Sequence, residues 1–289
     1  MGDVRLGALL GAENRSLSFD VASAALGALA VGSWSRVSAQ SSLALVTEAH
    51  SSGQGFQVRA NSDAAESFAL RYAFGFPGDA HARWAPDLTQ HTLRALAWAR
   101  AEDAQSGDQL RLVLQGSGGS ATALIAQAAA LARYELNLTG ITSAGDFPRF
   151  GVERVTQPGS VALVRLDDVL VAADEQTLLP GWDLARREEL IVSRHSSLAG
   201  RDAVTSWGGF QGFTLRLEWI AGSRADLLHH WWRGQVPCLF TLDTSDATAC
   251  WPVRIVNRQR PLGQRVRPHV DHYRGALELQ SIYGNELVF

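Results

Sequence analysis

The sequence predicts a mainly β protein, and two observations carry this prediction. Apolar and polar side chains alternate over short segments, and in one of them Phe56, Val58 and Ala60 share one side of the chain. Strict alternation is typical of a strand with one buried and one solvated face. Turn-forming residues separate these segments, as at residues 76–79 and 106–108. Strands at this spacing indicate a sandwich or a barrel.

Further strands of the first half follow the same rhythm. Alternation predicts strands over residues 68–76, 110–114 and 134–138. Two alanine-rich stretches are harder to place, because alanine favours helices. We leave residues 22–30 open. For residues 121–132 we favour a strand, since the stretch has no clear helix cap and leads directly into the next strand.

The second half begins with a change in composition, from alternating apolar residues to polar and turn-forming ones. Residues 172–183 include acids, Gln, Pro and Gly, and we predict a linker there. An alternating segment follows at residues 213–219, and a helix is predicted over residues 224–233, with Ser223 as its N-cap and Gly234 at its end. Three closing strands are predicted at residues 236–242, 251–256 and 273–282.

Composition and charge exclude several classes of protein. The chain has 289 residues, which is enough for two domains. Its formal charge is −3 and every basic residue is an arginine, which excludes a strongly basic nucleic-acid binder. No apolar run is long enough for a membrane-spanning helix, and the first residues make a poor secretory signal, so we expect no membrane insertion. Two cysteines exclude a disulfide framework and a four-cysteine metal site.

The first half resembles the jelly-roll domains of carbohydrate-binding modules. The resemblance rests on the strand at residues 161–170, which contains an Asp-Asp-Val segment, and on the strand at residues 93–100 before a Ser-Gly-Asp turn. It covers residues 15–172. It implies an N-terminal jelly-roll β-sandwich, to which we assign residues 1–175, and a carbohydrate ligand.

The second half resembles the distal tail and baseplate proteins of long-tailed bacteriophages. Such domains share an order of hairpin, helix and closing strands. The resemblance implies a tail-tube-like split β-barrel with one packed helix over residues 176–289. It also implies a homo-oligomeric ring, expected to be hexameric, that meets the tail tube and the baseplate hub. The segments that carry it are residues 213–219, 225–232, 236–240, 251–257 and 274–282.

Aromatic residues in loop-like segments are the candidates for a glycan site, because an exposed ring can stack on a sugar. Trp84 is the first choice, with His81 and Arg83 beside it in the sequence. Phe147 and Arg149 form the second candidate pair. Core packing is the alternative for each aromatic residue.

Two clusters are candidates for contacts between the subunits of a ring. Trp231 and Trp232 lie in the predicted helix, which is too apolar for a solvated side and therefore either packs deep in its own domain or meets a neighbour. Arg258, Arg260 and Arg265 lie in a predicted long hairpin loop, where guanidinium groups can pair with carboxylates of a neighbour. A solvated basic loop is the alternative.

Metal-binding and catalytic patterns are weak in this sequence. Asp168 is a candidate ligand for a structural calcium ion, as in many jelly rolls of this type, and we expect no other cofactor. Asp167 and Asp168 are adjacent on a strand, so they point to opposite faces and cannot form a glycosidase pair. Cys238 and Cys250 flank a predicted turn, and we expect two buried thiols rather than a disulfide.

These observations predict a structural protein without enzymatic activity. The predicted role is a ring at the distal end of a phage tail, in the virion and assembled in the host cytoplasm, with a peripheral domain that binds host-surface carbohydrate. A stand-alone carbohydrate-binding protein or adhesin is the alternative. A polysaccharide-degrading enzyme is less favoured, because no catalytic motif is present.

Overall fold

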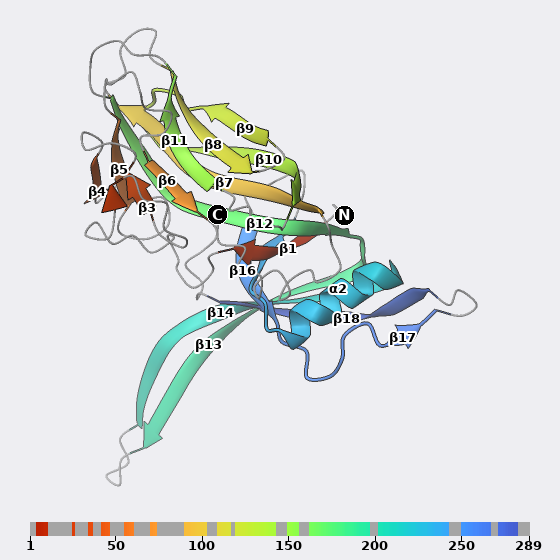
Figure 1. The fold of residues 1–289 in the computed structure, drawn as a ribbon. Helices are drawn as coiled ribbons and strands as arrows, with labels where there is room; N and C mark the ends of the chain where they lie inside the picture. The colour runs from red at the N-terminus through yellow and green to blue at the C-terminus, as the bar shows by residue number, and fades with distance from the viewer. Residues whose placement is uncertain are drawn as a thin grey trace. The chain divides into compact units, whose positions relative to one another are not determined.

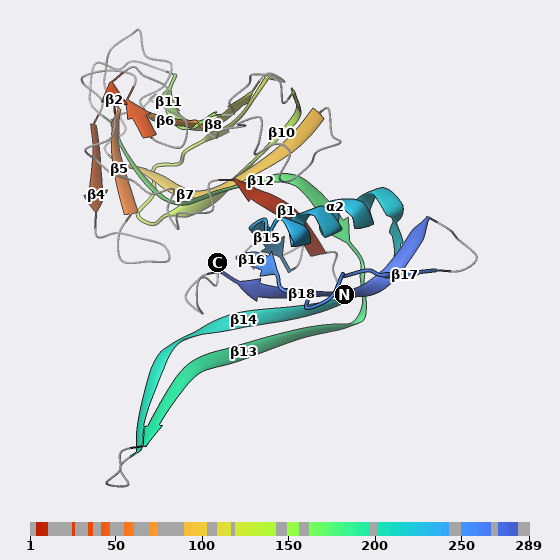
Figure 2. The same cartoon turned by 60° about the horizontal axis from the view of Figure 1, so that its bottom comes forward.

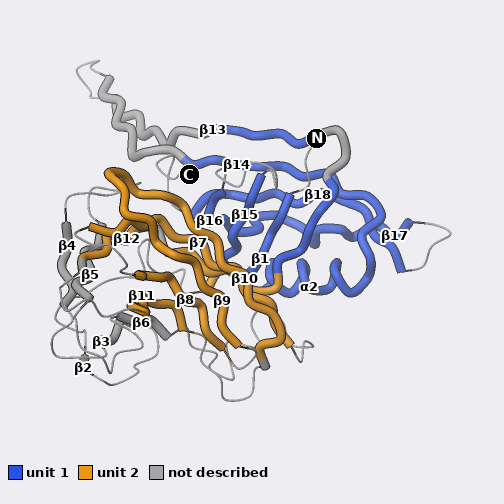
Figure 3. The backbone as a smooth tube through the Cα atoms, turned by 90° about the horizontal axis from the view of Figure 1, so that it is seen from above, with its two compact units in different colours: residues 1–8, 83–85, 175–289 blue, residues 9–82, 86–174 orange. Residues whose placement is uncertain are grey.

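The computed structural model divides the chain into two compact units. Unit 1 comprises residues 1–8, 83–85 and 175–289, and unit 2 comprises residues 9–82 and 86–174 (Figure 3). The antiparallel sheets confirm the predicted mainly β fold, and the part of the chain that is described contains one α-helix. The structure describes residues 4–10, 25–26, 34–36, 42–46, 55–60, 70–73, 90–102, 109–116, 119–142, 149–155, 162–196, 202–242, 250–266 and 271–282.

Unit 2 contains two sheets that form two layers (Figure 2). Their ladders are antiparallel except for the β2–β3 pair, which is parallel. The first layer has the order β4 (Ser42–Val46), β5 (Gly55–Ala60), β12 (Ala162–Leu178), β7 (Gln90–Glu102) and β10 (Ala132–Thr142). The second has the order β2 (Ala25–Leu26), β3 (Trp34–Arg36), β6 (Leu70–Ala73), β11 (Arg149–Arg154), β8 (Leu110–Gly116) and β9 (Gly119–Leu124).

The core of unit 2 follows the alternation that predicted its strands. Leu136 and Leu138 of β10 stand opposite Ala95 and Leu93 of β7, and all four are buried. The second layer buries its own alternate residues, among them Leu112, Leu114, Phe150 and Val152. The alanine-rich residues 121–132 form a strand only as far as Leu124, and β10 begins at Ala132.

The predicted linker at residues 172–183 is wrong. β12 continues to Leu178 and β13 begins at Pro180, so this stretch is regular strand. Asp174 has a φ of 53° and lies buried in β12. Its carboxylate binds Nδ1 of His91 at 2.6 Å and accepts the backbone N–H of Thr92 at 3.1 Å. An acid that is typical of a loop is therefore held inside the strand by partners more than eighty residues away in the sequence.

Unit 1 is built on one antiparallel sheet and the helix α2 (Gly222–Arg233) (Figure 1). β1 pairs with β15, which is why the first residues of the chain belong to this unit. The sheet has the order β1 (Val4–Leu10), β15 (Cys238–Thr241), β16 (Cys250–Ile255), β18 (His272–Ser281), β14 (Asp202–Ala221) and β13 (Pro180–Ser196), and β17 (Gln264–Arg265) pairs with β18.

Helix α2 contributes one apolar side to the core of unit 1. It begins at Gly222 directly after β14, with Ala221 at the N-cap position and no side-chain cap, so the predicted Ser223 cap is wrong. Gly234 ends the helix, as predicted. The helix buries Ala225, Leu228 and Trp231.

An aromatic cluster fills the core of unit 1. The ring of Phe213 lies 4.8 Å from that of Phe240 and 5.0 Å from that of Trp251. Cys238 and Cys250 are buried thiols and form no disulfide, which confirms the expectation. The two thiols are not opposite each other in the ladder, because Cys250 pairs with Thr241 and Cys238 with Val253.

Candidate functional site

β13 and β14 form a hairpin that continues beyond the sheet of unit 1. β14 pairs with β18 only from Gly212 to Ala221. The β13–β14 ladder continues from the pair Arg187–Gly212 to the pair Ser196–Asp202 (Figures 1 and 2). At about 3.3 Å per residue, this extension is roughly 30 Å long.

The extension has open edges. Among the described residues, β13 pairs only with β14, and β14 before Gly212 pairs only with β13. A two-stranded ribbon is marginally stable in water by itself. Its unpaired backbone N–H and C=O groups can accept a strand or a surface of another chain. The hairpin is therefore a candidate assembly site that sequence reasoning missed.

The two tryptophans predicted for an interface lie in different environments. Trp231 is fully buried in its own unit, so its side chain has no surface to offer a neighbour. Trp232 is half-buried, and its Nε1 donates to the backbone oxygen of Asn257 at 2.9 Å. Arg258, Arg260 and Arg265 are exposed. The helix thus packs deep in its own unit, which was the first of the two alternatives.

His229 links helix α2 to the arginine segment. Its buried ring contacts the backbone oxygen of Pro261 through Nε2, and the guanidinium of Arg260 lies 2.9 Å from Nδ1. Burial lowers the pKa of His229, although the contact with Pro261 opposes this, and the nearby Arg260 lowers the pKa further. A neutral ring that donates from Nε2 to Pro261 leaves Nδ1 as an acceptor for Arg260. His229 is therefore a packed histidine with a structural role.

Most of the predicted glycan site lies outside the described residues. These are Trp84, Arg83, His81 and Phe147, and the side chain of Asp168 also lies outside them. Arg149 is described, and it is half-buried at the start of β11 in the second layer of unit 2. No group of three metal-ligating side chains occurs among the described residues. No described helix is long and apolar enough to cross a membrane.

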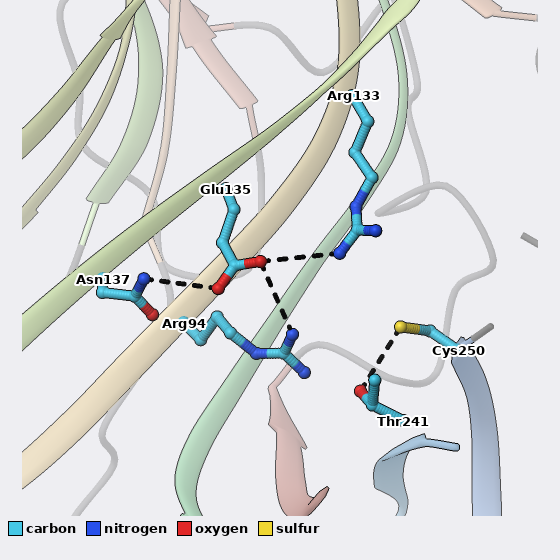
Figure 4. Close-up of polar contacts among 6 residues, drawn as sticks. All are labelled: Arg94, Arg133, Glu135, Asn137, Thr241 and Cys250. Carbon is cyan, nitrogen blue, oxygen red and sulfur yellow. Dashed lines mark hydrogen bonds and ion pairs between the residues drawn. The ribbon is translucent and has the colours of Figure 1, made fainter. Parts of the chain in front are cut away.

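Unit 2 instead displays a polar cluster on β7 and β10 (Figure 4). Glu135 of β10 accepts from Nδ2 of Asn137 at 3.3 Å and from Arg133 at 3.5 Å, and a guanidinium nitrogen of Arg94 lies 3.8 Å away. Glu135 and Asn137 are exposed. Alternation placed both on the solvated face of the predicted strand, but nothing in the sequence indicated that Arg94 of β7 would lie beside them.

Unit 2 also has a shallow hollow of about 510 Å³. Arg100 and Glu102 line it together with residues 127–129. Glu102 accepts from Nε of Arg165 at 2.9 Å, and Arg100 donates to the backbone oxygen of Ala128 at 3.2 Å. Planar charged and amide groups of this kind suit a ligand with many hydroxyl groups.

Trp219 departs from the predicted alternation. The sequence places it on the same side as Phe213, Leu215 and Leu217, which are buried, yet its side chain is 54% exposed. The β14–β18 register shifts between Leu217 and Ile220, and Trp219 has a φ of 59°. A bulge of this kind re-aims a side chain, and here it turns the indole outward.

Comparisons with known proteins give little further information. No family model matches the sequence, and no curated protein matches it. Solved structures that align with it include the CBM22-1 xylan-binding domain of Paenibacillus barcinonensis Xyn10C, with 8% identity over 48% of this chain and 85% of that chain, at a TM-score of 0.33.

The tandem CBM22-1–CBM22-2 domains of that Paenibacillus barcinonensis protein align with 10% identity over 73% of this chain and 65% of theirs, at a TM-score of 0.37. The CBM22-1–GH10 modules of Clostridium thermocellum xylanase 10B align with 12% identity over 51% of this chain and 27% of theirs, at a TM-score of 0.34. These chains include carbohydrate-binding modules.

Proposed function

We propose that this chain is a structural, non-catalytic subunit that assembles with copies of itself through the β13–β14 hairpin. The observation that carries the proposal is the roughly 30 Å extension of the hairpin, whose edges have no strand partner among the described residues. An arm that docks on a different surface of the next copy makes a heterologous contact. Repeated heterologous contacts close into rings or grow into filaments.

The setting that we propose is the ring at the distal end of a phage tail. The sequence resemblance of the second half supports this, since it implies a hexameric ring in the virion, next to the tail tube and the baseplate hub and assembled in the host cytoplasm. A hairpin, a packed helix and closing strands occur in that order in unit 1. The contact between copies needs no turnover, and the proposed role is therefore association alone.

The test compares the full chain with a variant whose hairpin is shortened. Residues 189–210 are replaced by an Asn-Gly turn, which favours a two-residue hairpin and keeps Glu188 opposite Gln211. The mass of each protein in solution is measured by light scattering. We expect a multiple of the chain mass for the wild type and the mass of one chain for the variant, with equal thermal stability of the folded units. A monomeric wild type, or a shortened variant that still assembles, would refute the proposal.

A second candidate function is carbohydrate binding by unit 2, which is the alternative that the sequence left open. The polar face of β7 and β10 supports it, because Glu135 and Asn137 are exposed and Arg133 and Arg94 hold the carboxylate of Glu135 in place. Sugar hydroxyl groups accept and donate to such planar groups. Several copies in a ring would present several weak sites and so gain avidity.

A glycan array on the full chain tests this second function. Asn137→Ala and Trp84→Ala are compared with Thr122→Ala, which changes an exposed residue of β9 in the other layer. We expect binding to one class of glycan that is weakened by Asn137→Ala and kept by Thr122→Ala. Weaker binding of Trp84→Ala would show that Trp84, the residue predicted from the sequence, contacts the glycan. Equal arrays for wild type and Asn137→Ala would exclude the polar face as the site.

A further inference from the structure

Unit 1 contains a groove that is lined by arginine. It lies on the outer face of β13, β14 and β18, beside residues 257–264, and its volume is about 940 Å³. Two carboxylates, those of Glu218 and Glu278, also line it. The five guanidinium groups at the groove belong to Arg187, Arg216, Arg258, Arg260 and Arg274.

Three of the five arginines have no carboxylate partner among the described residues. Arg258 makes no ion pair there, Arg260 contacts the ring of His229, and Arg274 donates to Oε1 of Gln264 at 3.0 Å. A guanidinium group has five donors and keeps its charge at any physiological pH. The groove therefore has more positive charge and more donors than its own residues satisfy.

The wall that carries Arg258 and Arg260 is held firmly in place. Asn257 accepts the backbone N–H of Glu278 at 2.8 Å and donates to the backbone oxygen of Ala276 at 3.0 Å. Leu262 is buried and adopts a φ of 51°. It lies so close to Gly275 that a Cβ there would be 2.8 Å from its backbone.

This anchoring means that residues 257–264, which belong to the predicted long hairpin loop, are packed on the sheet. Arginines on an anchored wall lose less conformational entropy on binding than arginines on a mobile loop. A built cluster of this kind favours planar anions that can bind two guanidinium donors at once, and carboxylates have this geometry.

We propose that the groove binds a carboxylate-rich polypeptide segment, and that in the assembly this segment belongs to unit 2 of a neighbouring copy. The second part rests on the proposed function. Charge complementarity supports it, since unit 1 has 15 arginines and 13 acidic residues, whereas unit 2 has 11 arginines and 16 acidic residues. A contact between unlike units is heterologous, as ring closure needs.

The binding test uses the full chain and a fluorescent oligoglutamate peptide, with anisotropy as the readout. We expect Arg258→Gln to weaken binding about tenfold, the loss typical of one charge-assisted contact. Arg254→Gln is the matched control, because Arg254 is exposed on β16 and lies outside the groove. Added salt should weaken binding to the wild type. Absence of peptide binding, or equal affinity for wild type and Arg258→Gln, would overturn the proposal.

Two further measurements test the chemical class of the ligand and its assignment to a neighbouring copy independently of each other. An oligothymidylate of equal charge replaces the peptide, and tighter binding with the same dependence on Arg258 would contradict the carboxylate assignment. Saturating oligoglutamate is then added to the assembled protein, and we expect the mass in solution to fall. An unchanged mass with bound peptide would overturn the neighbour assignment alone, and peptide binding to a monomeric wild type would refute the ring while the groove stands.

Discussion

Two segments of unit 1 contrast in how they are held. The hairpin extension of β13 and β14 is regular strand, yet among the described residues its two strands pair only with each other, apart from the Gln211 N–H at its base, which donates to Oγ of Ser281. The segment at residues 257–264 has almost no regular structure, yet it is anchored by Asn257, by the close approach of Leu262 to Gly275, and by His229. Regular secondary structure and firm anchoring are therefore separate properties, and the contacts of a segment decide which surface is preformed.

The anchoring at Gly275 gives the largest expected effect. In Gly275→Ala, the new Cβ would lie 2.8 Å from the backbone of Leu262, so the backbone of one segment must move. We expect a loss of about 3 kcal/mol in the free energy of unfolding of unit 1, measured by denaturant titration with tryptophan fluorescence. Hydrogen exchange at residues 257–264 should become faster at the same time.

Gly212→Ala is the matched control for this substitution. Gly212 lies where the hairpin leaves the sheet, and a Cβ there meets nothing closer than 3.7 Å, an ordinary contact. We expect its stability to stay near that of the wild type. Equal destabilisation of the two variants would show that the close approach at Gly275 is not what anchors the segment.

Asn257→Ala has the next largest expected effect. It removes the two hydrogen bonds to Glu278 and Ala276 and leaves their backbone groups without this partner. We expect a loss of about 2 kcal/mol in the free energy of unfolding, together with weaker oligoglutamate binding. Wild-type affinity for the peptide in this variant would contradict the claim that anchoring prepares the groove.

The smallest expected effect is a pH dependence at His229. Because burial lowers the pKa of His229 in the folded protein, the unfolded chain binds more protons below its ordinary pKa of about 6.5. The contribution of His229 to stability is therefore complete above that pH and is lost as the pH falls toward the folded pKa. The charged groups near it are Arg260, Asp226 and Arg233.

Melting temperatures between about pH 7.5 and pH 5 check this dependence. We expect the wild type to lose more stability over this range than His229→Gln, whose side chain does not titrate. Parallel curves for the two proteins would contradict a neutral His229 in the fold.

Local patterns predicted much of the fold. The alternation of apolar and polar residues correctly predicted β5, β8 and β10. The end of helix α2 was correctly predicted at Gly234, because glycine is common directly after a helix. The predicted linker failed because Asp174 is held by His91, a partner that no local pattern shows. The predicted burial side of Trp219 was wrong, because a bulge in β14 turns its side chain to the exposed face.

The candidate site was less predictable than the fold. Arg258 and Arg260 were singled out from their sequence. Their anchoring, however, depends on the hydrogen bonds of Asn257 to β18 and on the close approach of Leu262 to Gly275, which no local pattern shows. The hairpin extension was missed because the sequence of a strand does not show where the neighbouring strand of the sheet ends. The residues predicted for a glycan site, apart from Arg149, lie outside the described part of the chain.

Hydrogen exchange as a function of protein concentration tests the central claim most directly. If the hairpin docks on a neighbouring copy, the amides of residues 188–196 should exchange quickly in dilute solution and become protected as the concentration rises. The amides of β8, inside the sandwich of unit 2, should be protected equally at every concentration. Hairpin amides that exchange at one rate across the whole series would contradict the account.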